Sequence, residues 1–297
     1  MKPEDILARP ANVLTAEQRA FYFDNGYLTL ERFVSADWLQ RLNKVTGEFV
    51  DESRKLTKSN GKFDLEPDHT AENPRLRRLM TPVEHHAEYA EFGLRGPLID
   101  VAEDLLGPSV KYHHSKLNFK WSDGGEEVKW HQDFPFWPHS NSGQITIGLY
   151  LSDVDEEMGP LGVIPGSHKG RFYTHYDDER NWTGALSQRD LPEIDVENAA
   201  YLKGPAGSIT IHNSWMIHGS KPNNSPKPRN LLLNTYAAGD AVVLTNLVEP
   251  FEHSDILVRG EPPFAMEMEP RPFEMPPDWS GGYTSIFDLQ QKEHENP

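Results

Sequence analysis

Two histidines and one aspartate have the types and spacing of a metal site. His131 and Asp133 stand two residues apart, and His218 follows much later in the chain. In an extended segment, side chains two residues apart point to the same face, with Cα atoms about 7 Å apart, so both can reach one ion. Two imidazoles and one carboxylate are the ligands that hold non-haem Fe(II) on one side and leave positions open for chemistry. These residues therefore predict a ferrous centre.

A His-x-Asp pair is weak evidence by itself, because this chain has 13 histidines. Such a pair can also be two polar side chains on a surface strand. The context favours the metal site, because Trp130 precedes the pair, the aromatic run 134–138 follows it, and an apolar segment comes next. This neighbourhood predicts an enclosed cavity.

The second imidazole has competitors. His212 lies six residues before His218, and either could be a core histidine. We favour His218, because Gly219 lets backbone approach the site and Ser220 adds a hydroxyl. Four other histidines are possible ligands for which a structural role is the stronger interpretation: His113, His114, His139 and His168.

Arg229 lies eleven residues after His218 and begins an apolar segment. The window from Lys203 through Gly239 contains four basic residues and no Asp or Glu, although the chain as a whole is acidic. Arg229 can grip a carboxylate with two parallel hydrogen bonds, and Ser220 can donate another. This window therefore predicts a binding site for an anionic cosubstrate.

Composition narrows the classes of function. The net charge of −17 works against binding nucleic acid or an anionic membrane, so small molecules are the expected partners. The chain has no cysteine, so any metal must be held by histidine and carboxylate. No leader sequence and no apolar run of about 18 residues is visible, and we expect a cytoplasmic protein.

The first third of the chain predicts helices. Thr15 and Gln18 form a capping box at the start of one helix, and Gly26 is its expected end. A second helix is expected to begin near Ser35, and a third to end at Gly107-Pro108. The apolar faces expected for these two helices are Trp38, Leu39, Leu42 and Val45 for the second, and Leu98, Val101 and Leu105 for the third.

After Gly107 the pattern changes to short extended runs between turn residues, which is typical of antiparallel sandwiches and barrels. The expected strands are 113–121, 144–151, 162–165, 208–212 and 230–236. Residues 171–200 are polar and aperiodic, and we interpret them as a long insertion that could cover a site. The proline-rich segment 262–277 is expected to lie on the surface.

Several motifs together make the chain similar to the phytanoyl-CoA dioxygenase family of Fe(II)- and 2-oxoglutarate-dependent oxygenases. The similarity covers roughly 15–236. Leu14-Thr15-Ala16-Glu17-Gln18 and the two short runs 25–28 and 33–35 resemble the N-terminal part of the family's sequences. Residues 164–170 resemble one of the family's turns. The pair His131 and Asp133, and then His218, Ser220 and Arg229, match the family in order and spacing.

This resemblance implies one mainly β domain with flanking helices, built as a double-stranded β-helix, which is a jelly roll. Its parts would be a helical region of about 14–107, a jelly-roll core of about 108–240 and an extension of about 241–297. It also implies iron ligation by His131, Asp133 and His218, with Arg229 and Ser220 on the distal carboxylate of 2-oxoglutarate. Dioxygen would be the second cosubstrate and ascorbate a useful reductant in vitro.

The substrate is expected to be a small organic metabolite or natural-product intermediate that is hydroxylated or otherwise oxidised at an aliphatic C–H. The carboxylate of Asp133 argues against halogenation. Alternation places Asn118 near the cosubstrate. Candidates for the substrate pocket are Lys116, Phe134, Phe136, Trp137, His139 and Tyr150. An acyl-CoA hydroxylase, a silent jelly-roll binding protein and a zinc hydrolase remain alternatives.

Overall fold

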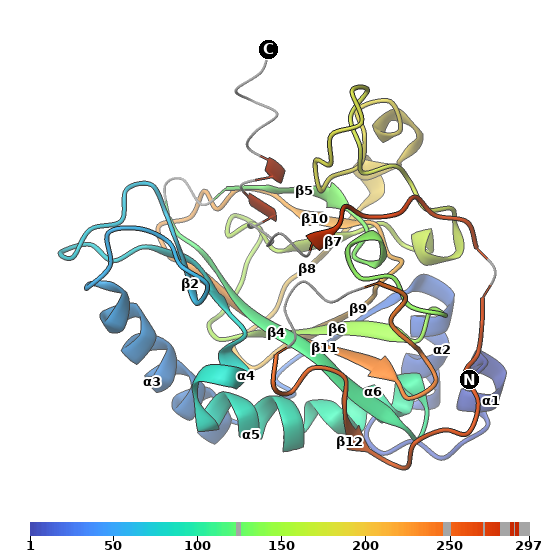
Figure 1. The fold of residues 1–297 in the computed structure, drawn as a ribbon. Coiled ribbons are helices and arrows are strands. Elements are labelled where there is room, and N and C mark those ends of the chain that lie inside the picture. The colour runs from blue at the N-terminus through green and yellow to red at the C-terminus, as the bar shows by residue number, and fades with distance from the viewer. Residues whose placement is uncertain (123–125, 246–250, 270, 280–285, 288, 291–297) are drawn as a thin grey trace.

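Two antiparallel β-sheets face each other, and helices cover the outer side of the larger sheet (Figure 1). The computed structural model describes residues 1–297 except 123–125, 246–250, 270, 280–285, 288 and 291–297. Parts of the predicted 241–297 extension and of the 262–277 segment therefore lie outside the described residues. The architecture agrees with the prediction of a mainly β fold with flanking helices.

The larger sheet has the strand order β1-β9-β6-β11-β4-β3-β2, and β12 also pairs with β4. The long strands β4, β6 and β11 form its centre, and every recorded pairing is antiparallel. The bounds are β1 Tyr27–Leu30, β2 Phe63–Leu65, β3 Leu76–Met80, β4 Val110–Lys120, β6 Gln144–Tyr150, β9 Ile209–Asn213, β11 Arg229–Ala238 and β12 Ile256–Arg259.

The smaller sheet has the order β5-β10-β7-β8 and lies above the larger one in Figure 1. Its strands are short, with three or four residues each. The bounds are β5 Val128–His131, β7 Leu161–Val163, β8 Ala200–Leu202 and β10 His218–Ser220.

The helices begin and end where their capping residues predict. Thr15 and Gln18 form the expected capping box, Gly26 ends that helix with φ of 82°, and Ser35 caps the next helix. Gly107 ends the helix that follows Pro97. The bounds are α1 Pro3–Leu7, α2 Ala16–Asn25, α3 Ala36–Ser53, α4 Pro82–His85, α5 Ala87–Arg95 and α6 Leu98–Leu106. None of the helices in the described part of the chain is long and apolar enough to cross a bilayer.

Alternation along the central strands divides the larger sheet into two faces. Leu117 and Phe119 of β4 belong to the main apolar cluster, together with Leu42 of α3 and Leu98 of α6. The intervening residues of β4 therefore point the other way, toward the smaller sheet. The helices thus bury one face of the larger sheet, and the space between the two sheets is left for polar side chains.

The first third is less helical than the sequence predicts. The strands β1, β2 and β3 also lie there and extend the larger sheet at both ends of its order. They have three to five residues each, which is too short for a clear alternating pattern. The five predicted strands are confirmed as β4, β6, β7, β9 and β11, with ends that differ by at most three residues.

The segment 171–200 has no long helix or strand, as predicted. It contains two single-turn 3-10 helices, Leu191–Glu193 and Val196–Asn198. Its backbone is attached to the metal-motif strand, because the amide of Leu186 donates to the carbonyl of Trp130 at 2.8 Å. The insertion therefore packs against the smaller sheet beside the site.

Candidate metal centre

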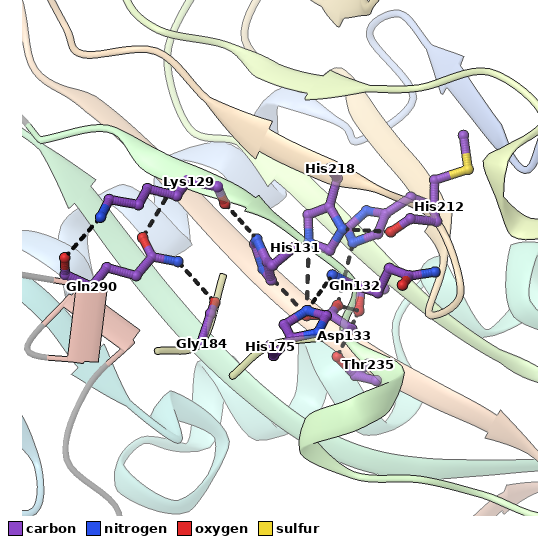
Figure 2. A network of polar contacts seen from close by, with 12 residues as sticks. Lys129, His131, Gln132, Asp133, His175, Gly184, His212, His218, Thr235 and Gln290 are labelled. Atoms are coloured by element: carbon purple, nitrogen blue, oxygen red, sulfur yellow. Dashed lines mark hydrogen bonds and ion pairs between the residues drawn. The ribbon is translucent and has the colours of Figure 1, made fainter. Parts of the chain in front are cut away.

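His131 and His218 are brought together by strand pairing in the smaller sheet. They are the last residue of β5 and the first of β10, and their Cα atoms are partners in the antiparallel register. Partners in such a register project to the same face. Their ring centroids are 4.1 Å apart, and both rings point toward Asp133 (Figure 2).

Asp133 reaches the same point by a different route from the one the sequence predicts. The strand ends at His131, and Asp133 has helical dihedrals, φ −70° and ψ −37°, at the start of the 3-10 turn Phe134–Phe136. Pro135 in that turn has a fixed φ that suits a turn better than a continuing strand. The alternation argument was therefore wrong about the backbone, although the two side chains do meet.

Three ligand atoms converge in the spacing that one ion requires. The Nε2 atoms of His131 and His218 each lie 3.7 Å from Oδ1 of Asp133. All three potential ligand atoms lie within 4.8 Å of one another. Atoms held about 2 Å from a common ion have separations of this order. The three residues are buried, so the group is shielded from water.

Backbone carbonyls fix the orientation of both imidazoles. Nδ1 of His131 donates to the carbonyl of Lys129 at 2.9 Å, and Nδ1 of His218 donates to that of Met216 at 3.0 Å. The proton of a neutral ring is thereby held on Nδ1, which leaves the Nε2 lone pair for a metal. Burial lowers the pKa of His131 to about 4 and that of His218 well below its usual value. Both rings are therefore neutral at physiological pH.

Asp133 is held as a carboxylate by its neighbours. Burial raises its pKa, but the surrounding imidazoles and Lys116 outweigh burial, so the pKa lies well below the usual range. Oδ2, the oxygen facing away from His131 and His218, lies 3.4 Å from Nε2 of His212 and accepts from Thr146 Oγ1 at 3.4 Å. Oδ1 remains directed at the two ligand nitrogens.

A small cavity of about 60 Å³ opens beside the three ligands. At one end Arg229, 3% exposed, lies opposite Lys120 in the β4–β11 register. No hydrogen-bond partner exists for Nε of Arg229 among the described residues, whereas Lys120 donates to Ser220 Oγ at 2.7 Å. A buried guanidinium without an anion is costly, so its surroundings fit a cosubstrate carboxylate.

Some of the predicted binding residues line the cavity, and others lie outside it. Besides the three potential ligands, its wall contains the predicted Asn118, Lys116, Ser220 and Arg229. Trp137 lies behind Lys116, whose Nζ is 5.5 Å from the ring centroid. Tyr150 donates its hydroxyl hydrogen to the carbonyl of Leu202 and does not line the cavity.

The remaining pocket candidates lie in neighbouring clusters. Phe134 stacks on Phe172 at a centroid distance of 4.4 Å, outside the cavity wall. Phe136 packs edge-on against His131 and Trp182. His139 pairs with Val243 through a β-bridge and is buried away from the ligands.

The other histidines do not join the ligand group. His113 and His114 contact each other through their Nδ1 atoms at 2.7 Å, because an irregularity in the β4–β11 register turns both inward. His168 lies against the carbonyl of Phe23. His212 lies outside the group of converging ligand atoms; its Nε2 faces Oδ2 of Asp133, and its ring packs on that of His218.

Several site residues were not singled out from the sequence. Lys120 lies on the face of β4 that alternation identified, but its contact with Ser220 depends on β10. Thr146 and Ile286 also line the cavity, and His175 accepts from the amide of Gln132 between the two motif residues at 3.0 Å. These contacts join segments far apart in the chain, so no local spacing indicates them.

Comparisons with known sequences agree with this geometry. The model of the phytanoyl-CoA dioxygenase (PhyH) family matches residues 22–231. The chain is similar to a probable alpha-ketoglutarate-dependent hypophosphite dioxygenase from Stutzerimonas stutzeri, with 30% identity over 93% of this chain and 97% of that protein. It is also 27% identical to the peroxisomal phytanoyl-CoA dioxygenase of Rattus norvegicus, over 77% and 70% of the two chains.

Solved structures share the fold. EctD from S. alaskensis with bound Fe superposes with a TM-score of 0.68 at 25% identity, over 88% of this chain and 90% of that one. The same enzyme with 2-oxoglutarate and 5-hydroxyectoine gives 0.66 at 25% identity, over 89% and 91%. These likenesses confirm the predicted jelly roll. The match extends over most of the chain and includes the strands that carry the site, so this protein belongs to the phytanoyl-CoA dioxygenase family and is an Fe(II)- and 2-oxoglutarate-dependent dioxygenase.

Proposed function

We propose that His131, Asp133 and His218 hold Fe(II), and that this enzyme oxidises an aliphatic C–H bond of a small organic metabolite. The observation that carries the proposal is the convergence of two Nε2 atoms and one carboxylate oxygen beside a cavity that ends in an unpartnered Arg229. Arg229 and Ser220 bind the distal carboxylate of 2-oxoglutarate, and Lys120 holds the Ser220 hydroxyl in place. Asn118, in the cavity wall, lies within the same space.

When bound, iron and 2-oxoglutarate supply the activation of dioxygen that an unreactive C–H bond requires. The residues of the chain bind, orient and exclude water. The locked imidazoles fix the directions of two ligand bonds, and Asp133 supplies the negative ligand. Because Asp133 fills the position that a halide would need, the expected product is an oxidised and not a halogenated molecule.

The substrate is a small molecule with little room around it. A cavity of about 60 Å³ favours a metabolite over an acyl-CoA thioester. Relatives with a small substrate in their names include the hypophosphite dioxygenase and the ectoine dioxygenase of Sphingopyxis alaskensis. The aromatic side chains behind the cavity, Phe136 and Trp137, make the surroundings of the iron dry, which favours oxidation over loss of the oxidant to water.

Succinate formation tests the proposal directly. Protein purified without oxygen is supplied with Fe(II), ascorbate, 2-oxoglutarate and then dioxygen, and succinate is measured without and with a panel of small metabolites. We expect slow succinate release that rises with one class of metabolite and gives a product heavier by one oxygen. No iron uptake and no succinate would refute the assignment and leave a silent binding protein. Activity without 2-oxoglutarate or oxygen would favour a zinc hydrolase.

A further inference from the structure

The cavity beside the metal ligands has an excess of positive charge at two separate places. Its described wall contains the cations Lys116 and Arg229 and one carboxylate, Asp133, which is a proposed metal ligand. In the β4–β11 register Arg229 faces Lys120, whereas Lys116 faces Leu233, four residues further along β11. Four residues of a strand span about 13 Å, so one carboxylate cannot bridge the two cations. The cosubstrate carboxylate at Arg229 thus leaves Lys116 without a partner.

Lys116 has no hydrogen bond or ion pair to any described residue. Its Nζ lies near the Trp137 ring, 5.5 Å from the centroid, and the partly buried side chain lines the cavity. Lys120, four residues later on the same face, instead donates to Ser220 Oγ at 2.7 Å and to the carbonyl of Lys221. A half-buried ammonium without an acceptor costs stability unless a ligand provides one. Lys116 therefore has the surroundings of a ligand-binding lysine.

Arg78 of β3 adds a second cation beside Lys116. It is the register partner of Asn118, and Met80 is the partner of Lys116, so Arg78 projects from the same face of the sheet. Arg78 is 3% exposed, and its Nε and Nη2 have no hydrogen-bond partner among the described residues. Its ion-pair partner Asp64 lies 3.6 Å from Nη2, beyond good hydrogen-bond length. Nε and Nη2 therefore lack an acceptor, and Arg78 lies next to the cavity wall without being part of it.

We propose that Lys116 and Arg78 bind an anionic group of the substrate, a carboxylate or a phosphorus oxyanion, and hold the substrate beside the iron. The inference rests on the proposed function and narrows its substrate class to small anions. Lys116 and Arg78 are neighbouring cations on one face of the sheet, and a bound oxyanion reduces their mutual repulsion and accepts hydrogen bonds from both. Asn118, in the wall between Lys116 and the Arg229 end, can add an amide donor to the same anion.

Binding of simple anions tests the inference without a known substrate. Acetate, methylphosphonate and the neutral acetamide are titrated into the anaerobic enzyme with Fe(II) and saturating 2-oxoglutarate. Binding is followed by the visible charge-transfer absorption of the iron–2-oxoglutarate complex and by calorimetry. We expect at least one anion to bind and acetamide to bind much more weakly. The tighter of acetate and methylphosphonate identifies which oxyanion the site prefers.

Substitutions assign the binding to the two cations. Lys116→Met and Arg78→Met should each weaken binding of the preferred anion by about 10- to 100-fold, the loss expected for a charge-assisted hydrogen bond. Lys116→Arg, which keeps the charge, should lose less. Lys44→Met, at an exposed lysine of α3, is the matched control and should bind the anion like the unaltered protein. Metal-free Lys116→Met should unfold at the same temperature as the unaltered protein or higher, which excludes a merely structural role.

The outcomes separate this inference from the proposed function. If the unaltered protein forms no iron–2-oxoglutarate complex, the proposed function fails. If the complex forms but the anions bind no better than acetamide, or bind equally to Lys116→Met, the inference fails alone. An equal loss of 2-oxoglutarate affinity in Lys116→Met would assign the lysine to the cosubstrate and would also overturn the inference.

Discussion

At the scale of single residues, one local bond recurs in four of the histidines that the structure describes. Nδ1 of His131, His139, His175 and His218 each lies 2.8 to 3.0 Å from the carbonyl two residues earlier. The bond fixes ring orientation but does not identify a ligand, because His139 points elsewhere and His175 accepts from the amide of Gln132. What distinguishes His131 and His218 is the carboxylate of Asp133 in front of their Nε2 atoms.

His212 should position Asp133 without binding iron. Its Nε2 lies 3.4 Å from Oδ2, so it can hold the carboxylate with Oδ1 toward the metal. We expect His212→Phe to weaken iron binding about 10- to 100-fold, as is usual when an outer partner of a metal ligand is lost. His212→Gln, which keeps a donor, should recover part of the loss. Iron titration of both variants gives the measurement, and unchanged affinity in His212→Phe would show that Asp133 needs no such support.

Arg229→Gln should raise the 2-oxoglutarate concentration needed for half-maximal succinate formation. The change removes a charge-assisted pair worth about 1.5 to 3 kcal/mol, so the expected increase is about 10- to 100-fold. Lys203→Met is a suitable control, because that lysine is exposed and pairs with Glu156 outside the cavity. Succinate release is measured at increasing 2-oxoglutarate concentration. An unchanged concentration for half-maximal succinate formation would show that Arg229 does not bind the cosubstrate.

The sequence can identify residues such as Asp133 and Arg229 because their type, neighbours and order along the chain are unusual. It cannot rank residues by contacts that only the fold creates. Lys120 and Lys116 have the same type and lie four positions apart on one face, yet only Lys120 meets acceptor atoms. The difference arises because β10 ends above Lys120 and not above Lys116.

At the scale of elements, strand length decides what the sequence could predict. The strands β4, β6 and β11 have 7 to 11 residues, and their alternation or apolar character is visible. The strands β5 and β10, which carry the two imidazoles, have four and three residues. So short a segment has no readable period, and its pairing depends on partners elsewhere in the chain.

A C-terminal segment closes the site from the side of the insertion. Ile286 lines the cavity, and Gln290 joins two other segments (Figure 2). Its Oε1 accepts from the amide of Lys129 at 3.0 Å, and its Nε2 donates to the carbonyl of Gly184 at 2.9 Å. This side chain therefore connects the extension both to the insertion and to the strand of His131.

Gln290→Ala should loosen this junction. Loss of the two hydrogen bonds is expected to accelerate hydrogen exchange of the Lys129 amide by about tenfold or more, because each bond contributes about 1 kcal/mol. Hydrogen exchange followed by mass spectrometry measures the effect. Gln40→Ala, at an exposed position of α3, should leave the exchange unchanged. Equal protection of Lys129 in Gln290→Ala would mean that the extension does not stabilise β5.

At the scale of the whole molecule, many histidines are buried in the neutral form. Burial is the main cause that lowers the pKa of His131 and His139 to about 4 and of His114 and His175 to about 3. An unfolded histidine has its pKa near 6.5. Between these values the unfolded chain binds more protons than the folded one, so stability falls as the pH decreases.

The metal-free protein should therefore keep its full histidine contribution above pH 6.5 and lose it progressively toward pH 4. Each such histidine adds a slope of about 1.4 kcal/mol per pH unit to the free energy of unfolding. His139→Asn, which lies outside the metal group and can still donate to the carbonyl of Trp137, should make the slope shallower by about that amount. Urea unfolding at several pH values tests this, and an identical slope would contradict it.

The whole-molecule prediction from sequence held for fold class, because helix caps and long alternating strands are local signals. The arrangement of two sheets around a polar interior also follows from alternation once β4 and β11 are paired. The contacts between distant segments cannot be predicted from alternation in this way. The contact of Gln290 with β5 joins positions more than 150 apart, and only chain folding brings them together.

The pairing of His131 with His218 across two short strands has a consequence for how the enzyme matures. If β5 slid by one residue against β10, its imidazole would turn to the opposite side of the ribbon, and the ion would lose a ligand. Iron can therefore be captured only after this ribbon has formed in the correct alignment, and its capture then penalises every misaligned form. Iron binding thus stabilises only the correct register of β5 and β10, and metal loading after folding should favour correctly folded chains.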